Sequence, residues 1–180
     1  MIAVYLANGF EEIEALAVVD VLRRAELEVR TIGVGGRTVT GAHGITVAAD
    51  VADADWDPDT VLEALVLPGG MPGTLHLEKA DTVQRALDRT VAGTGYICAI
   101  CAAPSILGHK GLLKGKRAVC FPGYEQELDG ALPGDEAVVT DGRFITAVGA
   151  GVAIDFGLEI VRWLCSPERA ALLRASMQCR

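Results

Sequence analysis

The stretch that most limits how this chain can fold is a short apolar run followed at once by small residues and a proline. The run extends from Tyr96 to Ile100 and is entered through Gly95, a pattern typical of a strand buried on both faces in a parallel sheet. Pro104 follows closely, and proline is tolerated in the first turn of a helix but not in its interior. The sequence therefore predicts a central strand that turns sharply into a helix, with Cys101 at the turn.

A cysteine at such a turn suits nucleophilic chemistry. The free N–H groups and the positive dipole end of the helix favour a thiolate. The sharp turn also lifts the sulfur toward solvent, as in the nucleophile elbow of hydrolases but with sulfur in place of oxygen. The alternative is that Cys101 is a small buried apolar side chain, as most free cysteines are. The rest of the chain has to distinguish the two.

Composition narrows the class of protein. The chain has 180 residues, of which 51% are hydrophobic, which predicts one domain over residues 1–180 with a substantial core. Its first residues read as a strand and not as a signal peptide, and no apolar run approaches the roughly 18–20 residues of a membrane span. Five cysteines without framework spacing fit a reducing compartment, so we expect a cytoplasmic protein. The net charge of −8 argues against a nucleic-acid partner.

The pattern of apolar residues predicts a three-layer α/β sandwich with a mostly parallel sheet. Residues 2–6 and 27–34 read as strands around a helix that opens at Glu11 and carries an apolar stripe of Ile13, Leu16, Ala17, Val21 and Leu22. Further strands are expected at 62–67, 96–100 and 117–121, and hairpins at 37–48 and 137–147. Residues 50–59 read as a surface connection. Helices are expected at 79–92, 152–165 and from Ser166 onward, with one or two helical turns at 124–128.

Three predicted strand ends converge at one edge of this sheet. They are the turn that leads to Glu14, the loop at Gly69 and Gly70, and the turn at Cys101. A carboxyl group beside a thiol is informative because two anions repel, so the acid is expected to hold a proton and donate it toward sulfur or substrate. The alternative is that Glu14 is a solvent-facing acid in the first turn of a helix, a role for which Glu11 and Glu12 are better placed.

Taken together, the motifs resemble those of the ThiJ/PfpI superfamily, in the branch that contains the parkinsonism-associated protein "DJ-one" and the bacterial protein YajL. The resemblance covers nearly the whole chain. Its specificity comes from the order and spacing of four stretches, which are Glu11-Glu12-Ile13-Glu14, Val66-Leu67-Pro68-Gly69-Gly70, Ala99-Ile100-Cys101-Ala102-Ala103-Pro104 and Ile154-Asp155-Phe156-Gly157-Leu158.

The resemblance implies a flavodoxin-like fold and, in most members, a homodimer. It makes Cys101 the reactive, oxidisable cysteine and Glu14 the protonated acid beside it. Gly70 and Ala102 match the positions whose backbone N–H groups face the reactive centre. The activities reported for the family are cofactor-free conversion of methylglyoxal to lactate, a disputed deglycation of proteins, and redox sensing or chaperone function. No cofactor or metal ion is therefore expected.

The sequence departs from the family pattern at one position. Many relatives place a histidine before a proline near the cysteine, and the matching pair here is Phe121-Pro122. Loss of an imidazole removes one general base, so we expect either slow turnover or chemistry that uses the thiol and Glu14 alone. Of the three histidines, His43 and His109 are remote from Cys101, and His76 is the one that could approach it.

Three other interpretations are disfavoured. Cys98 and Cys101 have dithiol spacing, but along a strand their Cα atoms would lie ~10 Å apart with side chains on opposite faces, too far for a disulfide. A glutamine amidotransferase would need a histidine late in the chain, and none follows His109. A PfpI-type peptidase would have histidine directly after the cysteine, where this chain has Ala102.

Two functions remain. The first is a glyoxalase or deglycase that acts on reactive dicarbonyls such as methylglyoxal, with Cys101 as nucleophile and Glu14 as acid–base group. The second is an oxidative-stress sensor or redox-regulated chaperone that works through oxidation of Cys101. Both need a reactive thiol, so the sequence does not separate them.

Overall fold

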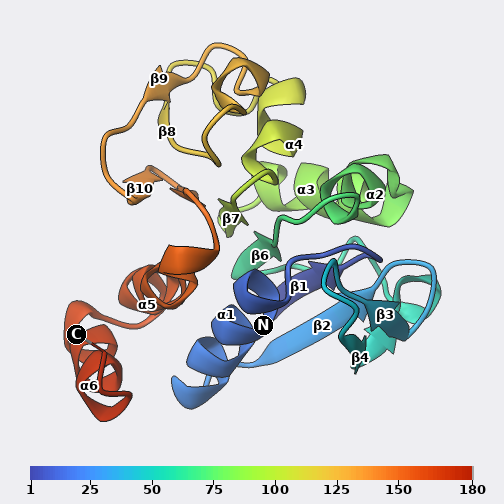
Figure 1. Ribbon diagram of the computed structural model, residues 1–180, viewed down its shortest axis with the longest axis horizontal. Coiled ribbons are helices and arrows are strands. Elements are labelled where there is room, and N and C mark those ends of the chain that lie inside the picture. Colours follow the sequence, from blue (N-terminus) through green and yellow to red (C-terminus); the bar gives the residue numbers. More distant parts are fainter. Residues whose placement is uncertain (180) are drawn as a thin grey trace.

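The computed structural model describes residues 1–179 and is built on a twisted central sheet (Figure 1). The sheet has the strand order β10-β11-β7-β6-β1-β2-β5, in which β10 and β11 are antiparallel and the other neighbouring pairs are parallel. The strands are β1 (Ile2–Leu6), β2 (Val29–Gly33), β5 (Val51–Ala52), β6 (Ala64–Leu67), β7 (Tyr96–Ile100), β10 (Val138–Asp141) and β11 (Phe144–Ala147). This is the mostly parallel sheet predicted from the sequence.

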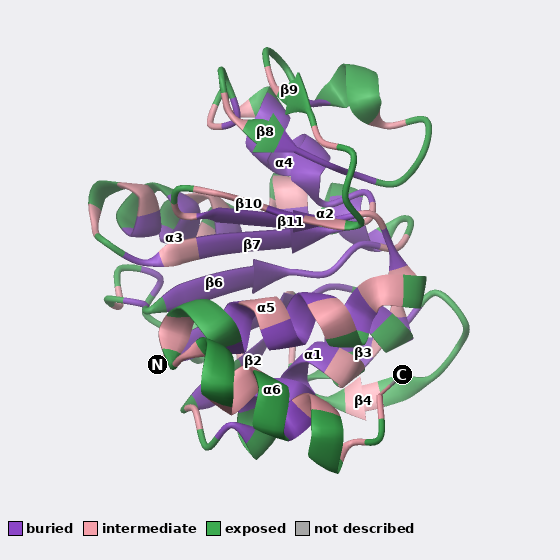
Figure 2. Ribbon diagram, turned by 90° about the vertical axis from the view of Figure 1, so that its left-hand side faces the viewer, coloured by how far each residue is buried: buried purple, intermediate pink, exposed green. Residues whose placement is uncertain are grey.

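Helices cover both faces of the sheet, which completes a three-layer, flavodoxin-like sandwich (Figures 1 and 2). One layer contains α1 (Glu12–Arg24), α5 (Ala153–Leu164) and α6 (Pro167–Ser176). The other contains α2 (Gly73–Lys79), α3 (Asp81–Ala92) and α4 (Pro104–His109). The predicted fold class is therefore confirmed.

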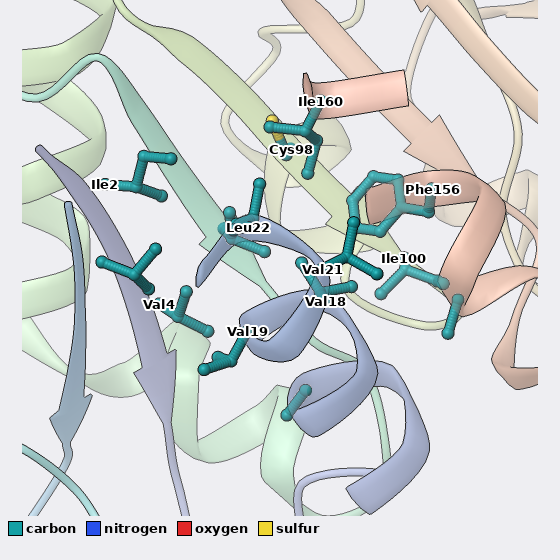
Figure 3. Packing of buried hydrophobic residues seen from close by; sticks show 14 of the residues in the cluster. Ile2, Val4, Val18, Val19, Val21, Leu22, Cys98, Ile100, Phe156 and Ile160 are labelled. Carbon is teal, nitrogen blue, oxygen red and sulfur yellow. The ribbon is translucent and has the colours of Figure 1, made fainter. Parts of the chain in front are cut away.

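The core lies in two clusters because successive strand residues point to opposite faces. In β1, Ile2 and Val4 pack toward α1 and α5, whereas Ala3 and Tyr5 pack toward the α3 and α4 layer. Figure 3 shows the first cluster, where Val18, Val21 and Leu22 of α1 meet Phe156 and Ile160 of α5 over Cys98 and Ile100 of β7. Burial of these apolar surfaces fixes the strand register, and so fixes where each strand ends.

Small elements project from this framework. The hairpin of β3 (Thr38–Thr40) and β4 (Thr46–Ala48) lies beside the N-terminus of α1, as its backbone hydrogen bond from Ala42 to Phe10 shows. An arm contains β8 (Arg117–Ala118), which pairs with β9 (Leu132–Pro133), and rises above the sheet in Figure 2. Short 3₁₀ turns are η1 (Asp53–Asp55), η2 (Glu125–Glu127) and η3 (Ala150–Val152).

The structure corrects several element boundaries. The predicted helix at 79–92 is α3 but begins two residues later, because Lys79 ends α2 and Ala80 is extended between the two helices. Part of the expected surface connection at 50–59 is the edge strand β5. The predicted strand at 117–121 is only two residues long and lies outside the main sheet. The reason is that the N–H of Val119 donates to Thr146 Oγ1, at 3.0 Å, which diverts the backbone from a strand ladder.

The apolar stripe predicted for the first helix is wrong at its start. Ile13 and Leu16 are exposed. Val21 and Leu22 of the predicted stripe are buried, together with Val18 and Val19. Ile154 and Trp163, two large apolar residues of α5, are exposed as well. Among residues 1–179, no helix has both the length and the apolar character that crossing a membrane requires.

Candidate active site at the carboxyl end of the sheet

The three predicted strand ends do meet at one edge of the sheet. β1, β6 and β7 are neighbours, and their carboxyl ends lead to α1, to the loop at Gly69 and Gly70, and to Cys101. The strand order reverses between β1 and β6, because β2 lies on one side of β1 and β6 on the other. In sheets of this kind, ligands bind beyond the carboxyl ends of the strands at such a reversal.

Cys101 lies on a sharp turn directly after β7. Its φ of 65° is in the left-handed region, which residues other than glycine, asparagine and aspartate rarely adopt. Two backbone hydrogen bonds hold this turn: Cys101 N–H donates to the Ala147 carbonyl at 2.9 Å, and its own carbonyl accepts from Phe121 N–H at 2.8 Å. α4 begins at Pro104, and the Cys101 side chain is partly exposed. This is the strand–turn–helix geometry of an elbow.

Glu14 lies inside the protein and not on the surface. It is 1% exposed, and its Oε2 atom accepts a hydrogen bond from Gly69 N–H at 2.9 Å. A methyl group on Gly69 would lie 2.7 Å from both the Cβ atom of Cys101 and Oε2 of Glu14. The missing side chain at position 69 is therefore what allows the carboxyl group and the cysteine to approach each other.

Two backbone N–H groups face the sulfur of Cys101, those of Ala102 and Gly70. Gly70 can present its N–H in this direction because its φ is 91°, a conformation natural to glycine. A side chain at this position would also collide with the backbone nitrogen of Glu11, at 2.4 Å. The arrangement resembles an oxyanion hole, in which fixed donors stabilise charge that develops during a reaction.

The thiol and the carboxyl group resist carrying negative charge together. Burial raises the pKa of Glu14 to about 7, and hydrogen bonds from Cys101 and Gly69 only partly offset this effect. Burial, and then the charge of Glu14, raise the pKa of the Cys101 thiol to about 12, against the opposing effect of the Ala102 and Gly70 N–H groups. Near neutral pH the pair therefore carries at most one negative charge, shared across a hydrogen bond.

This finding differs from the expectation that the helix N-terminus favours a thiolate at Cys101. The N–H groups act in the expected direction, but burial and Glu14 outweigh them. α4 covers only Pro104–His109, so the helix behind the elbow is short. The thiol is thus expected to react by passing its proton to Glu14.

The histidines do not take part in this site. His76 hydrogen-bonds through Nδ1 to the carbonyl oxygen of Asn8, at 2.8 Å, in a hollow beside Val34 and Lys79. His109 lies between the carboxylates of Glu78 and Glu127. His43 binds Glu12 on the β3–β4 hairpin. Phe121, at the position where the resemblance implies a histidine in many relatives, donates its N–H to the Cys101 carbonyl.

The dithiol interpretation also finds no support. The five cysteines, all within the described residues, are free, and Cys98 is completely buried, which raises the pKa of its thiol. The expectation that Cys98 and Cys101 point to opposite faces is wrong, because both pack with the cluster under α1 and α5. The left-handed backbone at Cys101 breaks the alternation of the strand.

Sequence reasoning missed two features around the site. Glu12, expected to face solvent, is buried and holds the β3–β4 hairpin, since Oε1 accepts from the N–H groups of His43 and Ile45. Gly149 lies close to both Phe121 and Glu14, since a methyl group there would lie 3.4 Å from the ring and 3.9 Å from Glu14 Oε1. In the sequence, only the two glycines that flank Ala150, between a strand and a helix, indicate that the backbone comes close to other groups at this point.

The fold and the site define an α/β protein with a cysteine elbow that is paired with a buried carboxyl group. The model of the DJ-1/PfpI family matches residues 1–163, and the chain belongs to this family.

Individual relatives agree with this assignment. Protein dj-1beta of Drosophila melanogaster is 35% identical over 169 residues, which cover 92% of this chain and 90% of the relative. The glutathione-independent glyoxalase DJR-1.2 of Caenorhabditis elegans is 34% identical, over 88% of this chain and 85% of the relative. The structure of oxidized DJ-1 of Toxoplasma gondii superimposes with a TM-score of 0.94 at 30% identity, covering 98% of this chain and 97% of that one.

Proposed function

We propose that this protein is a cysteine-dependent, cofactor-free enzyme of the glyoxalase or deglycase type that acts on small reactive dicarbonyls such as methylglyoxal. The observation that carries the proposal is the buried Glu14 carboxyl group, hydrogen-bonded to Cys101, with a pKa that burial raises to about 7. A group with this pKa both accepts and donates protons efficiently near neutral pH. The name of the Caenorhabditis elegans relative supports the same reaction class.

In the first step, the sulfur of Cys101 attacks the aldehyde carbon of the substrate. A C–S bond forms, the thiol proton passes to the Glu14 carboxylate, and the π electrons of the carbonyl move onto its oxygen. The N–H groups of Gly70 and Ala102, which face the sulfur, are placed to bind that oxygen. The product of this step is a hemithioacetal once the oxygen takes up a proton.

The following steps move protons and need no redox partner. Glu14, again ionised, removes the proton from the former aldehyde carbon, which gives an enediol as the ketone oxygen takes up a proton. The neighbouring carbon is then protonated and the hydroxyl group on the sulfur-bearing carbon loses its proton, which gives a thioester of lactate. Water then cleaves the C–S bond, and lactate leaves as the Cys101 thiol re-forms. The net reaction adds one water to methylglyoxal, so the oxidation of one carbon is balanced by the reduction of the other.

A second candidate function uses the same thiol. Cys101 is partly exposed and lies beside an acid that can supply or accept a proton. Attack of its thiolate on a peroxide would transfer one oxygen to sulfur, giving a sulfenic acid and water or an alcohol, and a second peroxide would give the sulfinic acid. In this role the protein would be an oxidative-stress sensor or a redox-regulated chaperone.

Steady-state conversion of methylglyoxal to lactate separates the two candidates. We expect turnover by the wild-type protein and its loss in Cys101→Ser, whereas Cys165→Ser, which changes an exposed cysteine, keeps wild-type rates. Absence of turnover, together with suppression of a client's aggregation only after peroxide treatment, would favour the sensor or chaperone instead.

We also propose that the protein forms a homodimer. Ile13 and Leu16 on α1 and Ile154 on α5 are exposed although all three are large and apolar, and the two helices pack side by side (Figures 1 and 2). A second copy would remove these side chains from water. Sedimentation equilibrium is expected to give a dimer mass, and Ile13→Glu to give a monomer.

A further inference from the structure

Phe121 is an exposed aromatic residue near the buried carboxyl group of Glu14. Its ring is 48% exposed, whereas Glu14 is 1% exposed. The two are brought together at Gly149, where a methyl group would lie 3.4 Å from Cδ2 of the ring and 3.9 Å from Oε1 of Glu14. The ring edge and this oxygen therefore border the same small space.

The two oxygens of the carboxyl group have different surroundings. Oε2 accepts the hydrogen bond from Gly69, and a methyl group on Gly69 would lie 2.7 Å from both this oxygen and Cβ of Cys101. Oε1 is the oxygen beside Gly149 and Phe121. Water that reached Glu14 from the Gly149 side would hydrate Oε1, and the Phe121 ring lies on that side.

The Phe121 ring is also tied to the reactive turn. The N–H of Phe121 donates to the carbonyl oxygen of Cys101 at 2.8 Å, so the residue that borders Oε1 is anchored to the nucleophile's own backbone. The chain on either side is on the surface, since Pro122 and Gly123 are exposed. Phe121 thus places an apolar ring from an exposed loop beside Gly149 and the turn at Cys101.

We propose that Phe121 is a positioning residue that closes the thiol site: its ring covers the outer oxygen of Glu14 and keeps water from it, and Gly149 provides the room for the ring. This inference rests on the proposed use of Glu14 as the acid–base group. Removing water from one side of a carboxyl group disfavours its charged form, so Phe121 acts on catalysis through Glu14 and not by touching protons itself.

Few charged groups face Glu14, so a change in its titration midpoint on replacing Phe121 can be measured without large contributions from other charges. Cys101 faces it from the end of β7, and Glu11 adds a repulsive charge from the start of the same helix. His43 lies 3.3 Å from Glu11. The loops at Gly69 and Gly149 contribute backbone to this contact, and the Phe121 side contributes an uncharged ring.

The test is an NMR titration of carboxyl-labelled glutamate, with the Glu14 signal assigned by its absence in Glu14→Gln. In Phe121→Ala we expect the midpoint of Glu14 to fall by about one pH unit, because water gains access to Oε1. Phe121→Leu, which keeps an apolar cover, should stay within about 0.3 pH unit of wild type. Leu132→Ala removes another exposed apolar side chain from the same arm and should leave the midpoint unchanged.

An unchanged or raised midpoint in Phe121→Ala would overturn the inference, and so would a fall in Leu132→Ala as large as that in Phe121→Ala. These readouts do not depend on turnover. If wild type and variants titrate as expected but no dicarbonyl is converted, then the proposed function fails and the covering role of Phe121 stands.

Discussion

Glu12 and Glu14 lie two residues apart at the start of α1, and both side chains are buried, yet their pKa values are shifted in opposite directions. Burial raises the pKa of Glu14 to about 7. Burial acts in the same direction on Glu12, but the hydrogen bonds of its carboxylate outweigh it and leave the pKa below its ordinary value. Neighbouring positions on one helix thus carry a fixed anion and a group that exchanges protons near neutral pH.

The number of hydrogen-bond donors explains the difference. Glu12 accepts the N–H groups of His43, at 2.8 Å, and Ile45, at 3.3 Å, and its other oxygen lies 3.0 Å from Nδ1 of His43. Glu14 has the N–H of Gly69, and its second neighbour is the thiol of Cys101, which becomes a repelling anion when it ionises. Donors stabilise a carboxylate. The two donors of Glu14, the thiol of Cys101 and the N–H of Gly69, also lower its pKa, but they do not offset its deeper burial.

The comparison distinguishes a carboxylate that holds two segments together, Glu12, from a carboxyl group placed to exchange protons, Glu14. Glu12 holds the β3–β4 hairpin against the helix, and its charge is satisfied at every oxygen. Glu14 is left short of donors beside the reactive thiol, which is the arrangement expected of a group that must gain and lose a proton. Burial alone would not have identified the functional residue.

The largest expected effect is on turnover. Glu14→Gln should lower kcat/KM for methylglyoxal by about 100-fold or more while the fold is retained, because an amide cannot shuttle a proton. Glu12→Gln should change kcat/KM by less than about twofold. The measurement is initial rates corrected for the folded fraction; similar losses in both variants would remove the distinction between the two residues.

The second effect is on stability as a function of pH. The folded-state pKa of Glu14 is raised from 4.5 to about 7, so its stabilising contribution is complete below about pH 4.5 and is lost as the pH rises through 7. The loss amounts to about 3 kcal/mol between pH 5 and pH 8. Denaturant unfolding of wild type should show this decline relative to Glu14→Gln; parallel curves would mean that Glu14 is not held protonated.

The smallest effect concerns Glu12. Replacing it by glutamine should lower the free energy of unfolding by about 1 kcal/mol at neutral pH, because charge-assisted hydrogen bonds to the hairpin are weakened. Its pKa is lowered in the folded state, so the stabilisation is present above the ordinary pKa and disappears as the pH falls below it. Wild type and Glu12→Gln should therefore converge in acid, and a difference that persists there would contradict the assignment.

The sequence was sufficient for the framework of the sheet and for the meeting of Glu14, Gly70 and Cys101. Short apolar runs bounded by glycine and proline predict buried parallel strands, and such strands bring their carboxyl ends to one edge. The strand at residues 96–100 and the Asp141-Gly142 hairpin are confirmed in this way. These features depend on local patterns, which a sequence displays directly.

The missed features depend on contacts between distant segments. The strand expected at 117–121 is cut short because the backbone of Val119 binds Thr146 and that of Phe121 binds Cys101. The fate of Glu12 depends on two N–H groups of a hairpin about thirty residues away. The exposure of Ile13 also follows from how α1 packs on α5, since an apolar period does not say which part of a stripe is covered.

The left-handed backbone at Cys101 also has a consequence for how the chain balances folding against reactivity. A side chain held at a φ of 65° carries roughly 1–2 kcal/mol of strain that a glycine would not. A chain selected for stability alone would place glycine at position 101, at the end of a buried strand. Stability therefore favours glycine at position 101, whereas the proposed chemistry requires cysteine. The buried core around the turn offsets the strain of the Cys101 backbone.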